Sequence, residues 1–428
     1  MHDLKRAITI LLLLAGISTA SPGLITKFPI YDRFRYEIPI QMYEGKECVI
    51  SVRGQAVLEC YRGVRLSEIY YFSSPIYIKY ESHGLVVSDS SGELAMGLAE
   101  IRCKPHDNSS VIEYEGRGYR GFLRVLFFEE PPLLALYNMA FIEDYLKGVL
   151  PGEIGNRSAK EFEAAKAQAV AARTYAVWKL TDFKSDGRLV PTIADQLYTG
   201  KDSEIPLLSE AVEATRGEIV TYGGRAIAAY YHSVCGGHTS AVQNVWPDKP
   251  AAAYLVGVPD KTYCSWAKYY SWSENFDLAT LQKNISKYFI ENRLASPADF
   301  GSILDVSFNW SNKDSLDLSD ENDGTQKYSR KRNIVVKTDS GIFSVRADKI
   351  RWALCRASNS NAILPSTMFI SEKIVDNGNF AGLRLKGKGN GHGVGMCQCG
   401  AIGQSRSGRN YQEILKFYYK RTKLSKLY

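Results

Sequence analysis

The sequence of 428 residues lacks most of the features that mark a chain as something other than a globular protein. Beyond its first residues it has no run of eighteen uninterrupted apolar residues, so it offers no typical membrane-spanning helix. It also lacks dense basic runs, zinc-finger spacing and internal repeats. The net charge of +7 favours an anionic partner, but it does not indicate nucleic acid. Collagen-like, coiled-coil and low-complexity classes are excluded.

What the sequence does contain is ample material for a packed core. Hydrophobic residues make up 45% of the chain and charged residues 23%, with 27 Tyr and 17 Phe. The length is about three times that of a typical domain of roughly 150 residues. We therefore expect two domains, or one domain with a sizeable elaboration.

The first twenty residues are typical of a cleavable secretory signal. Lys5 and Arg6 precede the apolar stretch from Ala7 to Ile17, and the small residues Ser18 and Ala20 follow it. An uncleaved anchor is the alternative, but this stretch is too short for a bilayer core of about 30 Å. We expect a signal peptide over residues 1–20 and an extracytoplasmic mature protein, in the periplasm or cell wall, where disulfides can persist.

Residues 21–136 predict a β-rich N-terminal region. Short alternating runs such as 70–80 and 119–130 are separated by Gly, Ser, Asn and Asp. No motif in this region indicates a function.

Residues 137–428 predict a second domain that mixes helices and strands. Helical spacing covers 141–150 and 158–180, and Ser158 and Glu161 form a reciprocal capping box at the start of the second helix. Further elements are expected as a helix at 207–215, a polar insertion at 314–332, strands at 333–338 and 341–347, a glycine-dense loop at 387–395 and a final helical stretch into 411–419. The predicted fold class is α+β.

Six ordered segments of this second domain carry a family resemblance. They are YLKGVLPGEIG (145–155), AAKAQAVAARTYAV (164–177), DQLYTG (195–200), AVEATRGEIVTYGGRAIAAYYHSVCGGHT (211–239), LPSTMFI (364–370) and GKGNGHGVGMCQCGAIGQSRSGRNYQEILKFYY (387–419). Their order and spacing resemble the stage II sporulation protein D (SpoIID) family, which includes LytB-type amidase enhancers. The resemblance implies a SpoIID-like catalytic domain with a cleft. It also implies a lytic transglycosylase that cuts MurNAc–GlcNAc bonds of peptidoglycan strands, preferentially those stripped of stem peptides.

Glu153 is the expected catalytic residue. Cleavage of a glycosidic bond needs a proton for the leaving oxygen, which a carboxylic acid in an apolar setting can supply. Glu153 lies in PGEIG, in what we expect to be a short connection between two helices. From the residues alone a solvated loop glutamate is the stronger interpretation. The resemblance reverses this, because Glu153 stands where the family's catalytic acid stands.

Five further residues are expected to hold the glycan. Gln196 and Tyr198 in DQLYTG offer hydrogen bonding and stacking, and Arg173 offers a bidentate partner for a muramyl carboxylate, although it equally suits pairing with a structural acid. His392 lies among closely spaced glycines that bring the backbone near a ligand or another segment, and Gln398 follows it. The residues argue against a phosphate-binding loop there, since neither the dinucleotide fingerprint nor a GK[ST] ending is present.

HSVCGGH suggests a metal site. His232, Cys235 and His238, with Cys264 further on, have the composition of a closed tetrahedral Zn²⁺ site, and some family members carry zinc at this motif. Four protein ligands leave no position for water, so this zinc would be structural. The competing interpretation is a Cys235–Cys264 disulfide, which would leave both histidines unexplained.

The other cysteines allow several bridges. Cys48 and Cys60 could clip a hairpin, and Cys397 or Cys399 could pair with Cys355. The family more often has Ser and Trp at positions 397 and 399.

Two alternatives to the transglycosylase stay open from the sequence. One is a noncatalytic wall-binding protein that stimulates a partner N-acetylmuramoyl amidase, and the other is a zinc hydrolase, against which the four apparent ligands argue.

Overall fold

The structure, a computed structural model, describes residues 37–182, 187–309, 329–330 and 333–428. The predicted signal peptide lies outside these residues, as does most of the predicted insertion at 314–332. The chain divides into two compact units. Unit 1 comprises residues up to Ala228 together with Lys423–Tyr428, and unit 2 comprises Ala229–Thr422.

The N-terminal half of unit 1 consists of two antiparallel six-stranded sheets, which confirms the predicted β-rich region. The first has the order β1 (Glu37–Gly45), β12 (Pro132–Phe141), β11 (Phe122–Glu129), β8 (Glu100–Pro105), β3 (Ala56–Arg62) and β4 (Arg65–Phe72). The second has the order β10 (Arg117–Tyr119), β9 (Val111–Tyr114), β2 (Glu47–Arg53), β5 (Ile76–Glu81), β6 (Gly84–Asp89) and β7 (Gly92–Leu98). Strands such as β3 bury alternate side chains, as expected where one sheet face covers a core.

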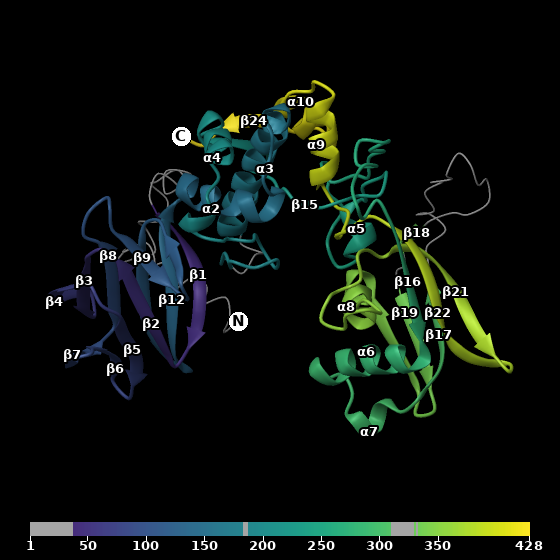
Figure 1. Cartoon of the computed structure of the whole chain (residues 1–428), viewed down its shortest axis with the longest axis horizontal. Coiled ribbons are helices and arrows are strands. Elements are labelled where there is room, and N and C mark those ends of the chain that lie inside the picture. Colours follow the sequence, from purple (N-terminus) through teal and green to yellow (C-terminus); the bar gives the residue numbers. More distant parts are fainter. Residues whose placement is uncertain (1–36, 183–186, 310–328, 331–332) are drawn as a thin grey trace. The chain divides into compact units, whose positions relative to one another are not determined.

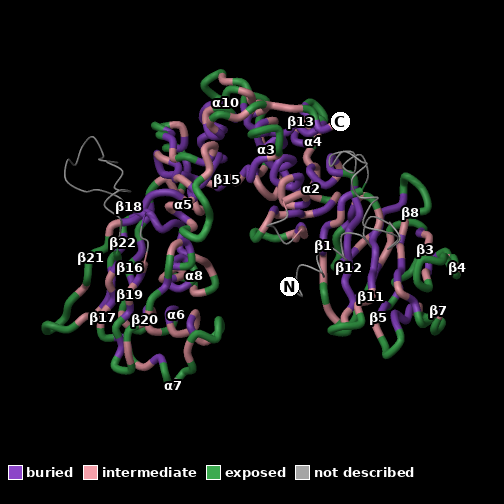
Figure 2. The backbone as a smooth tube through the Cα atoms, turned by 180° about the vertical axis from the view of Figure 1, so that it is seen from behind, coloured by how far each residue is buried: buried purple, intermediate pink, exposed green. Residues whose placement is uncertain are grey.

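Three helices gather beyond one end of these sheets (Figure 1). They are α2 (Ile142–Ile154), α3 (Phe162–Thr181), which follows the 3-10 turn η2 (Ala159–Glu161), and α4 (Pro206–Ala214). The predicted capping box is present, with the Ser158 amide donating to Glu161 at 2.9 Å. Most of α3 is buried (Figure 2), because its small alanine side chains allow close packing on all sides.

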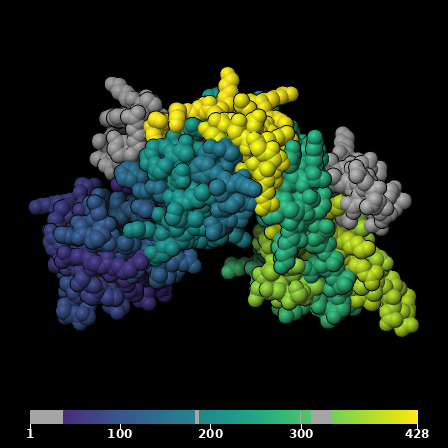
Figure 3. Space-filling view, turned by 45° about the horizontal axis from the view of Figure 1, so that its top comes forward, coloured from purple at the N-terminus to yellow at the C-terminus, as the bar shows by residue number. Residues whose placement is uncertain are grey.

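Helices and strands of unit 1 form one body, and the space-filling view shows its purple-to-blue and teal parts in continuous contact (Figure 3). Arg120, between β10 and β11, binds Glu204 after η3 (Lys201–Ser203) with two hydrogen bonds of 2.5 and 2.7 Å. The predicted boundary at residue 136 therefore does not coincide with the division into units. The unit closes with a small sheet of β14 (Arg225–Ala226), β13 (Glu218–Tyr222) and β24 (Lys423–Lys426).

Unit 2 contains two antiparallel sheets with helices alongside them (Figure 1). One sheet has the order β16 (Ser271–Asp277), β22 (Asn379–Lys388), β21 (Met368–Asp376) and β18 (Ser329–Arg330), and the other β17 (Ile303–Asn309), β19 (Asn333–Thr338) and β20 (Ile342–Arg346). Strands β19 and β20 confirm the strands expected at 333–338 and 341–347. The adjoining helices are α6 (Leu278–Glu291), α7 (Pro297–Phe300), η5 (Ala347–Lys349) and α8 (Ile350–Leu354).

The core of unit 2 lies between these sheets and α6. Leu281 and Ile285 of α6 pack with Phe276, Val336 and Leu385 of the strands. The remaining elements are α5 (Val242–Val245), the parallel pair β15 (Tyr231–His232) and β23 (Met396–Cys397), and the helices α9 (Gln398–Arg406) and α10 (Tyr411–Tyr418). The α+β class is confirmed. No helix within the described ranges is long and apolar enough to cross a membrane.

Candidate functional site

The predicted site residues fall into two groups, one in each unit. Unit 1 holds Glu153, Arg173, Gln196 and Tyr198, and unit 2 holds His232, Cys235, His238, Cys264, His392 and Gln398.

Glu153 lies in the last turn of α2, not in the loop expected from the sequence. The helix continues past Leu150 because Pro151 is accommodated within it, and it ends only at Gly155, whose φ of 69° is readily adopted by glycine. The Glu153 side chain is half-buried, and its Oε1 accepts a hydrogen bond of 2.7 Å from the amide of Leu197. A helix therefore supports the carboxylate on one side and the DQLYTG segment on the other.

Two glycines of α2 let the DQLYTG segment approach this closely. A Cβ at Gly148 would lie 2.6 Å from the Tyr198 ring, and one at Gly152 would lie 2.8 Å from the carbonyl oxygen of Leu197. The Gly148 carbonyl accepts from both the amide and the hydroxyl of Thr199, at 3.0 and 2.8 Å. The segment is thus bonded along the helix beside Glu153.

Gln196 and Tyr198 are buried in unit 1, with 0% and 2% of their surface exposed. Gln196 donates to the Ala172 carbonyl at 3.2 Å and accepts from Tyr145 Oη, while Tyr198 Oη donates to Asn138 at 2.9 Å. These contacts hold the segment that faces Glu153. Direct contact with a glycan stays a prediction for both residues.

Arg173 is fully buried and pairs with Glu143 through two hydrogen bonds of 2.9 and 2.6 Å. It also donates to the carbonyl oxygens of Glu218 and Val212. This geometry favours the alternative interpretation, pairing with a structural acid, over recognition of a muramyl carboxylate.

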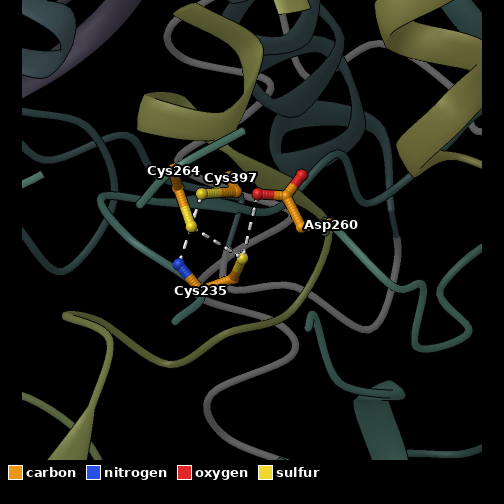
Figure 4. Close-up of side chains that lie close together, drawn as sticks. All are labelled: Cys235, Asp260, Cys264 and Cys397. Carbon is orange, nitrogen blue, oxygen red and sulfur yellow. Dashed lines mark hydrogen bonds between the residues drawn. The ribbon is translucent and has the colours of Figure 1, made fainter. Parts of the chain in front are cut away.

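In unit 2 the structure brings together a set of possible metal ligands that differs from the predicted one (Figure 4). Ligand atoms of Cys235, Asp260, Cys264 and Cys397 all lie within 4.8 Å of one another, and all four residues are buried. Thiolate sulfurs with one carboxylate oxygen are a donor set suited to tetrahedral Zn²⁺. The predicted Cys235 and Cys264 belong to this cluster, whereas Asp260 and Cys397 replace the two histidines.

The pKa values of the four side chains in this cluster are shifted from their ordinary values. Burial raises the pKa of Cys235 and Cys397, whereas hydrogen bonds from the Cys235 and Cys397 thiols hold the pKa of Cys264 well below its ordinary value. Burial, with the nearby Cys264, raises the pKa of Asp260 to about 8. A bound cation would compensate the negative charge that these four groups can carry.

Neighbouring residues orient the cluster. Tyr418 donates its hydroxyl to Asp260 Oδ1, and the amides of Cys235 and Gly400 donate to Cys397 Sγ at 3.2 Å. A Cβ at Gly400 would lie 2.2 Å from Tyr418 Oη and 2.5 Å from Asp260 Oδ2, so any larger residue there would displace these two groups. Such outer contacts fix ligand geometry in metal sites.

The predicted ligands His232 and His238 do not join the cluster. His232 Nδ1 lies 3.2 Å from the Val394 carbonyl oxygen, and His238 Nδ1 contacts the carbonyl of Thr239. Gly236 and Gly237, with φ of 72° and 106°, turn the chain away after Cys235. The Asp260 amide then bonds the Gly237 carbonyl at 2.9 Å, which brings Asp260 to the place expected for a histidine. The sequence signal for Asp260 was its position in VPDKTYC, four residues before Cys264.

His392 is half-buried within a group of aromatic rings. Its ring lies 4.9 Å from that of Trp246 and 5.5 Å from that of His232, and burial lowers the pKa of both histidines. Lys249 lies over the rings of Trp246 and Tyr230. Gln398 begins α9 and is 6% exposed. Substrate contact stays a prediction for His392 and Gln398.

All eight cysteines are free, so none of the bridges that the sequence allows is formed in the structure. Cys48 on β2 faces Ile78 and Cys60 on β3 faces Ile101, in different sheets. The sulfurs of Cys235 and Cys264 are 3.5 Å apart, longer than a disulfide bond of about 2.05 Å. Cys397 lies in the metal-type cluster instead of bridging to Cys355.

Comparison with known proteins gives independent evidence on the family of this chain. Residues 134–222, which include Glu153, match the model of the SpoIID family, described as stage II sporulation protein. An uncharacterized protein of Brachyspira hyodysenteriae is 34% identical over 356 residues, covering 80% of this chain and 84% of that protein.

Two Bacillus subtilis proteins are also similar. The amidase enhancer is 29% identical over 351 residues, covering 76% of this chain, and stage II sporulation protein D is 30% identical over 133 residues, covering 27%. The matches span 47% and 38% of the lengths of those two proteins. With the ordered segments and the family match around Glu153, they show that the chain belongs to the stage II sporulation protein D family.

Proposed function

We propose that this protein is a peptidoglycan lytic transglycosylase with Glu153 as its catalytic acid and base. The observation that carries the proposal is the position of Glu153 within the family-matched residues 134–222, half-buried and held by the Leu197 amide at 2.7 Å. A carboxylate fixed from two sides has the pre-organisation that proton transfer requires. The relatives named amidase enhancer and stage II sporulation protein D support a wall-related role.

One carboxyl group is enough for this reaction. Protonated Glu153 gives its proton to the glycosidic oxygen as the bond from C1 of the muramic acid breaks. The resulting carboxylate then takes the proton of the C6 hydroxyl, whose oxygen bonds to C1 and closes a 1,6-anhydro ring. No water enters the products, unlike glycoside hydrolysis with its two carboxylates.

Product analysis tests this role. Peptide-stripped glycan strands incubated with the mature protein should yield anhydro-ended fragments in mass spectra, and Glu153→Gln should abolish them while strand binding persists. Glu210→Gln, at an exposed position of α4, is the matched control and should cleave like the wild type. Full activity of Glu153→Gln would contradict the proposal, and reducing ends in place of anhydro ends would indicate a hydrolase.

A noncatalytic amidase enhancer is the second candidate, favoured by the similarity of 351 residues to the protein of that name. Its test is a mixture of this protein with an N-acetylmuramoyl amidase and intact peptidoglycan. An enhancer would increase stem-peptide release equally as wild type and as Glu153→Gln. A transglycosylase would do so only with Glu153 present, through the strands it cuts.

For the cluster of Cys235, Asp260, Cys264 and Cys397 we propose structural Zn²⁺. Bound there, the ion would neutralise the thiolates and brace the loops that carry them. Protein purified without added metal should contain one zinc per chain by elemental analysis, and Cys264→Ser should lose it and unfold at a lower temperature. Cys399→Ser, outside the cluster, is the control.

The proposed location is extracytoplasmic, because the substrate lies there and residues 1–20 have the pattern of a signal peptide. N-terminal sequencing of the exported protein should begin near Ser21.

A further inference from the structure

Helices α9 and α10 are neighbours in unit 2 (Figure 1), and the loop of residues 261–268 packs against them. A Cβ at Gly403 of α9 would overlap the Tyr263 carbonyl oxygen, so the loop backbone touches this helix. The rings of Tyr263 and of Phe417 on α10 meet edge to face, with their centroids 6.4 Å apart. The side chains gathered at this contact form what we call the α9–α10 surface: Tyr263, Trp266, Arg406, Arg409, Phe417 and Lys420.

Aromatic rings hold the two arginines of this surface in place. The guanidinium carbon of Arg406 lies 4.2 Å from the centre of the Trp266 ring. That of Arg409 lies 5.3 Å from the Tyr263 ring and 5.5 Å from the Phe417 ring. A guanidinium that stacks on a ring keeps its N–H groups at its edge, where a planar anion can meet them. Stacking also restricts the arginines before a ligand arrives, which reduces the entropy lost on binding.

The charge of this surface is strongly positive. Residues 261–268 and 402–421 contain seven basic residues and one acidic residue, Glu413. The Glu413 carboxylate caps the start of α10, whereas Arg409 donates to the neutral side chain of Gln404 at 2.9 Å. Lys420 adds a further cation, with its Nζ 5.1 Å from the centre of the Phe417 ring. An excess of cations in one place attracts an anionic ligand.

The neighbouring stretch of the chain does not cancel this charge. The Lys420 amide bonds the Tyr254 carbonyl at 3.3 Å, and residues 249–259 around Tyr254 contain no acid. Asp260, the next residue, is 0% exposed and accepts from the Tyr418 hydroxyl inside the cysteine cluster. It is therefore out of reach of a ligand at the surface.

Trp266 indicates that the anion also carries sugars. Its side chain is 45% exposed, and its Nε1 already donates to the Tyr263 carbonyl at 3.0 Å. What it offers to a ligand is apolar ring surface, which suits the C–H-bearing face of a pyranose ring. A membrane surface would need several exposed apolar side chains, but Tyr263 and Phe417 are partly buried.

We propose that the α9–α10 surface binds glycan strands that carry carboxylates, with Arg406 and Arg409 on the carboxylates and Trp266 on a sugar face. Hydrolysis of the amide that joins a stem peptide to muramic acid leaves a free carboxylate on the lactyl group. A stripped strand therefore repeats this anion along a chain of sugars. The choice of this glycan rests on the proposed wall function. The surface supplies affinity for the strand, separately from proton transfer at Glu153.

Binding to three probes tests the ligand class. Fluorescence anisotropy with the mature full chain as Glu153→Gln compares labelled stripped strands, the same strands with their carboxylates converted to methylamides, and poly-γ-glutamate. The stripped strands should bind at least about tenfold more tightly than either of the others, because only they combine anions with sugars. Equal binding of the methylamide strands would exclude recognition of carboxylates, and equal binding of poly-γ-glutamate would exclude recognition of sugars. Either result would overturn the proposal.

Variants in the same Glu153→Gln protein locate the binding. Arg406→Gln with Arg409→Gln should weaken the stripped strands about tenfold and make the affinity less dependent on salt. Arg406→Gln alone, at an exposed position, should weaken them about threefold, which tests the surface even if the double variant does not fold. Lys283→Gln, an exposed cation of α6, is the matched control and should bind like the parent protein.

A purely structural role for the two arginines gives a different result. In that case the arginine variants would unfold at a lower temperature and bind the strands with unchanged affinity and salt dependence, which would overturn the proposal. Binding of phosphatidylglycerol vesicles that depends on Arg406 while strand binding does not would assign the surface to a membrane instead. Failure of the catalytic proposal is distinct from these outcomes, because it appears as anhydro-ended products released by Glu153→Gln.

Discussion

At the scale of single residues, the pair Arg173–Glu143 shows how a site prediction and a stability role can be told apart. Arg173→Met should leave Glu143 buried without its partner and lower the free energy of unfolding by about 3–5 kcal/mol. Urea unfolding followed by circular dichroism measures this. The double variant Arg173→Met with Glu143→Leu should be less destabilised than the single one, because no charge is left buried.

A matched control for that pair is Arg216→Ala, an exposed arginine that pairs with Glu213. It should change stability by less than about 0.5 kcal/mol. If Arg173→Met were as mild as this control and impaired only glycan binding, Arg173 would be a substrate residue after all.

The buried His232 predicts that the folded protein loses stability at acidic pH. Burial, followed by the nearby Arg330, lowers the pKa of His232 to about 3 in the folded protein, against about 6.5 in an unfolded chain. Below about pH 6.5 the unfolded chain therefore takes up a proton that the folded protein does not, and stability falls as the pH falls toward 3. The midpoint of thermal unfolding should drop between about pH 7 and about pH 5, and less so in His232→Gln. His83→Gln, at an exposed position, should drop like the wild type, and an identical drop in His232→Gln would remove His232 from this role.

At the scale of elements, the contact between α2 and residues 196–200 determines where the Glu153 carboxylate lies. Gly152→Ala places a Cβ 2.8 Å from the Leu197 carbonyl oxygen, so the segment must move away. We expect glycan cleavage to fall by about tenfold or more, because small displacements of catalytic groups are costly, while the helical circular-dichroism signal stays unchanged. Cleavage at the wild-type rate, with Glu210→Gln as the reference, would show that this contact does not position Glu153.

Helices and strands were predicted correctly where neighbouring residues in the sequence alone determine them. The helix at 158–180 followed from its capping box and small residues, and β19 matches the expected strand at 333–338. Helical spacing in the sequence extends only to residue 150, and proline and glycine usually end helices, but α2 accommodates Pro151 and continues to Ile154.

Only two of the four residues in the cluster of Cys235, Asp260, Cys264 and Cys397 could be predicted from the sequence, because the other two meet them through contacts that spacing along the chain does not indicate. Cys235 and Cys264 were expected from spacing, but Cys397 is 162 residues from Cys235, and Asp260 enters only through the backbone contact with Gly237. Spacing along the sequence cannot show contacts between such distant residues. His232 and His238 lie close to Cys235 in sequence, so the sequence predicts them as ligands in place of Asp260 and Cys397.

At the scale of the whole molecule, residues after unit 2 return to complete unit 1. Strand β24 pairs with β13, the amide of Leu427 bonds the Gly217 carbonyl at 2.7 Å, and Tyr428 Oη donates to Glu143 at 2.5 Å. Deleting residues 423–428 should lower the thermal midpoint of the protein and expose the edge of β13 to proteases. Tyr428→Phe, which removes one hydrogen bond, should have a smaller effect, and an unchanged midpoint after the deletion would contradict a structural role for β24.

The same pairing has a consequence for synthesis. Thr221 and Lys423 are neighbours across β13 and β24 although 202 residues separate them. At about 5–20 residues per second, a ribosome needs roughly 10–40 s to cover that interval. During this interval the backbone N–H and C=O groups on one edge of β13 are unpaired and can bond to any extended segment of another chain. We therefore expect a chaperone to protect the new chain until β24 has been synthesised.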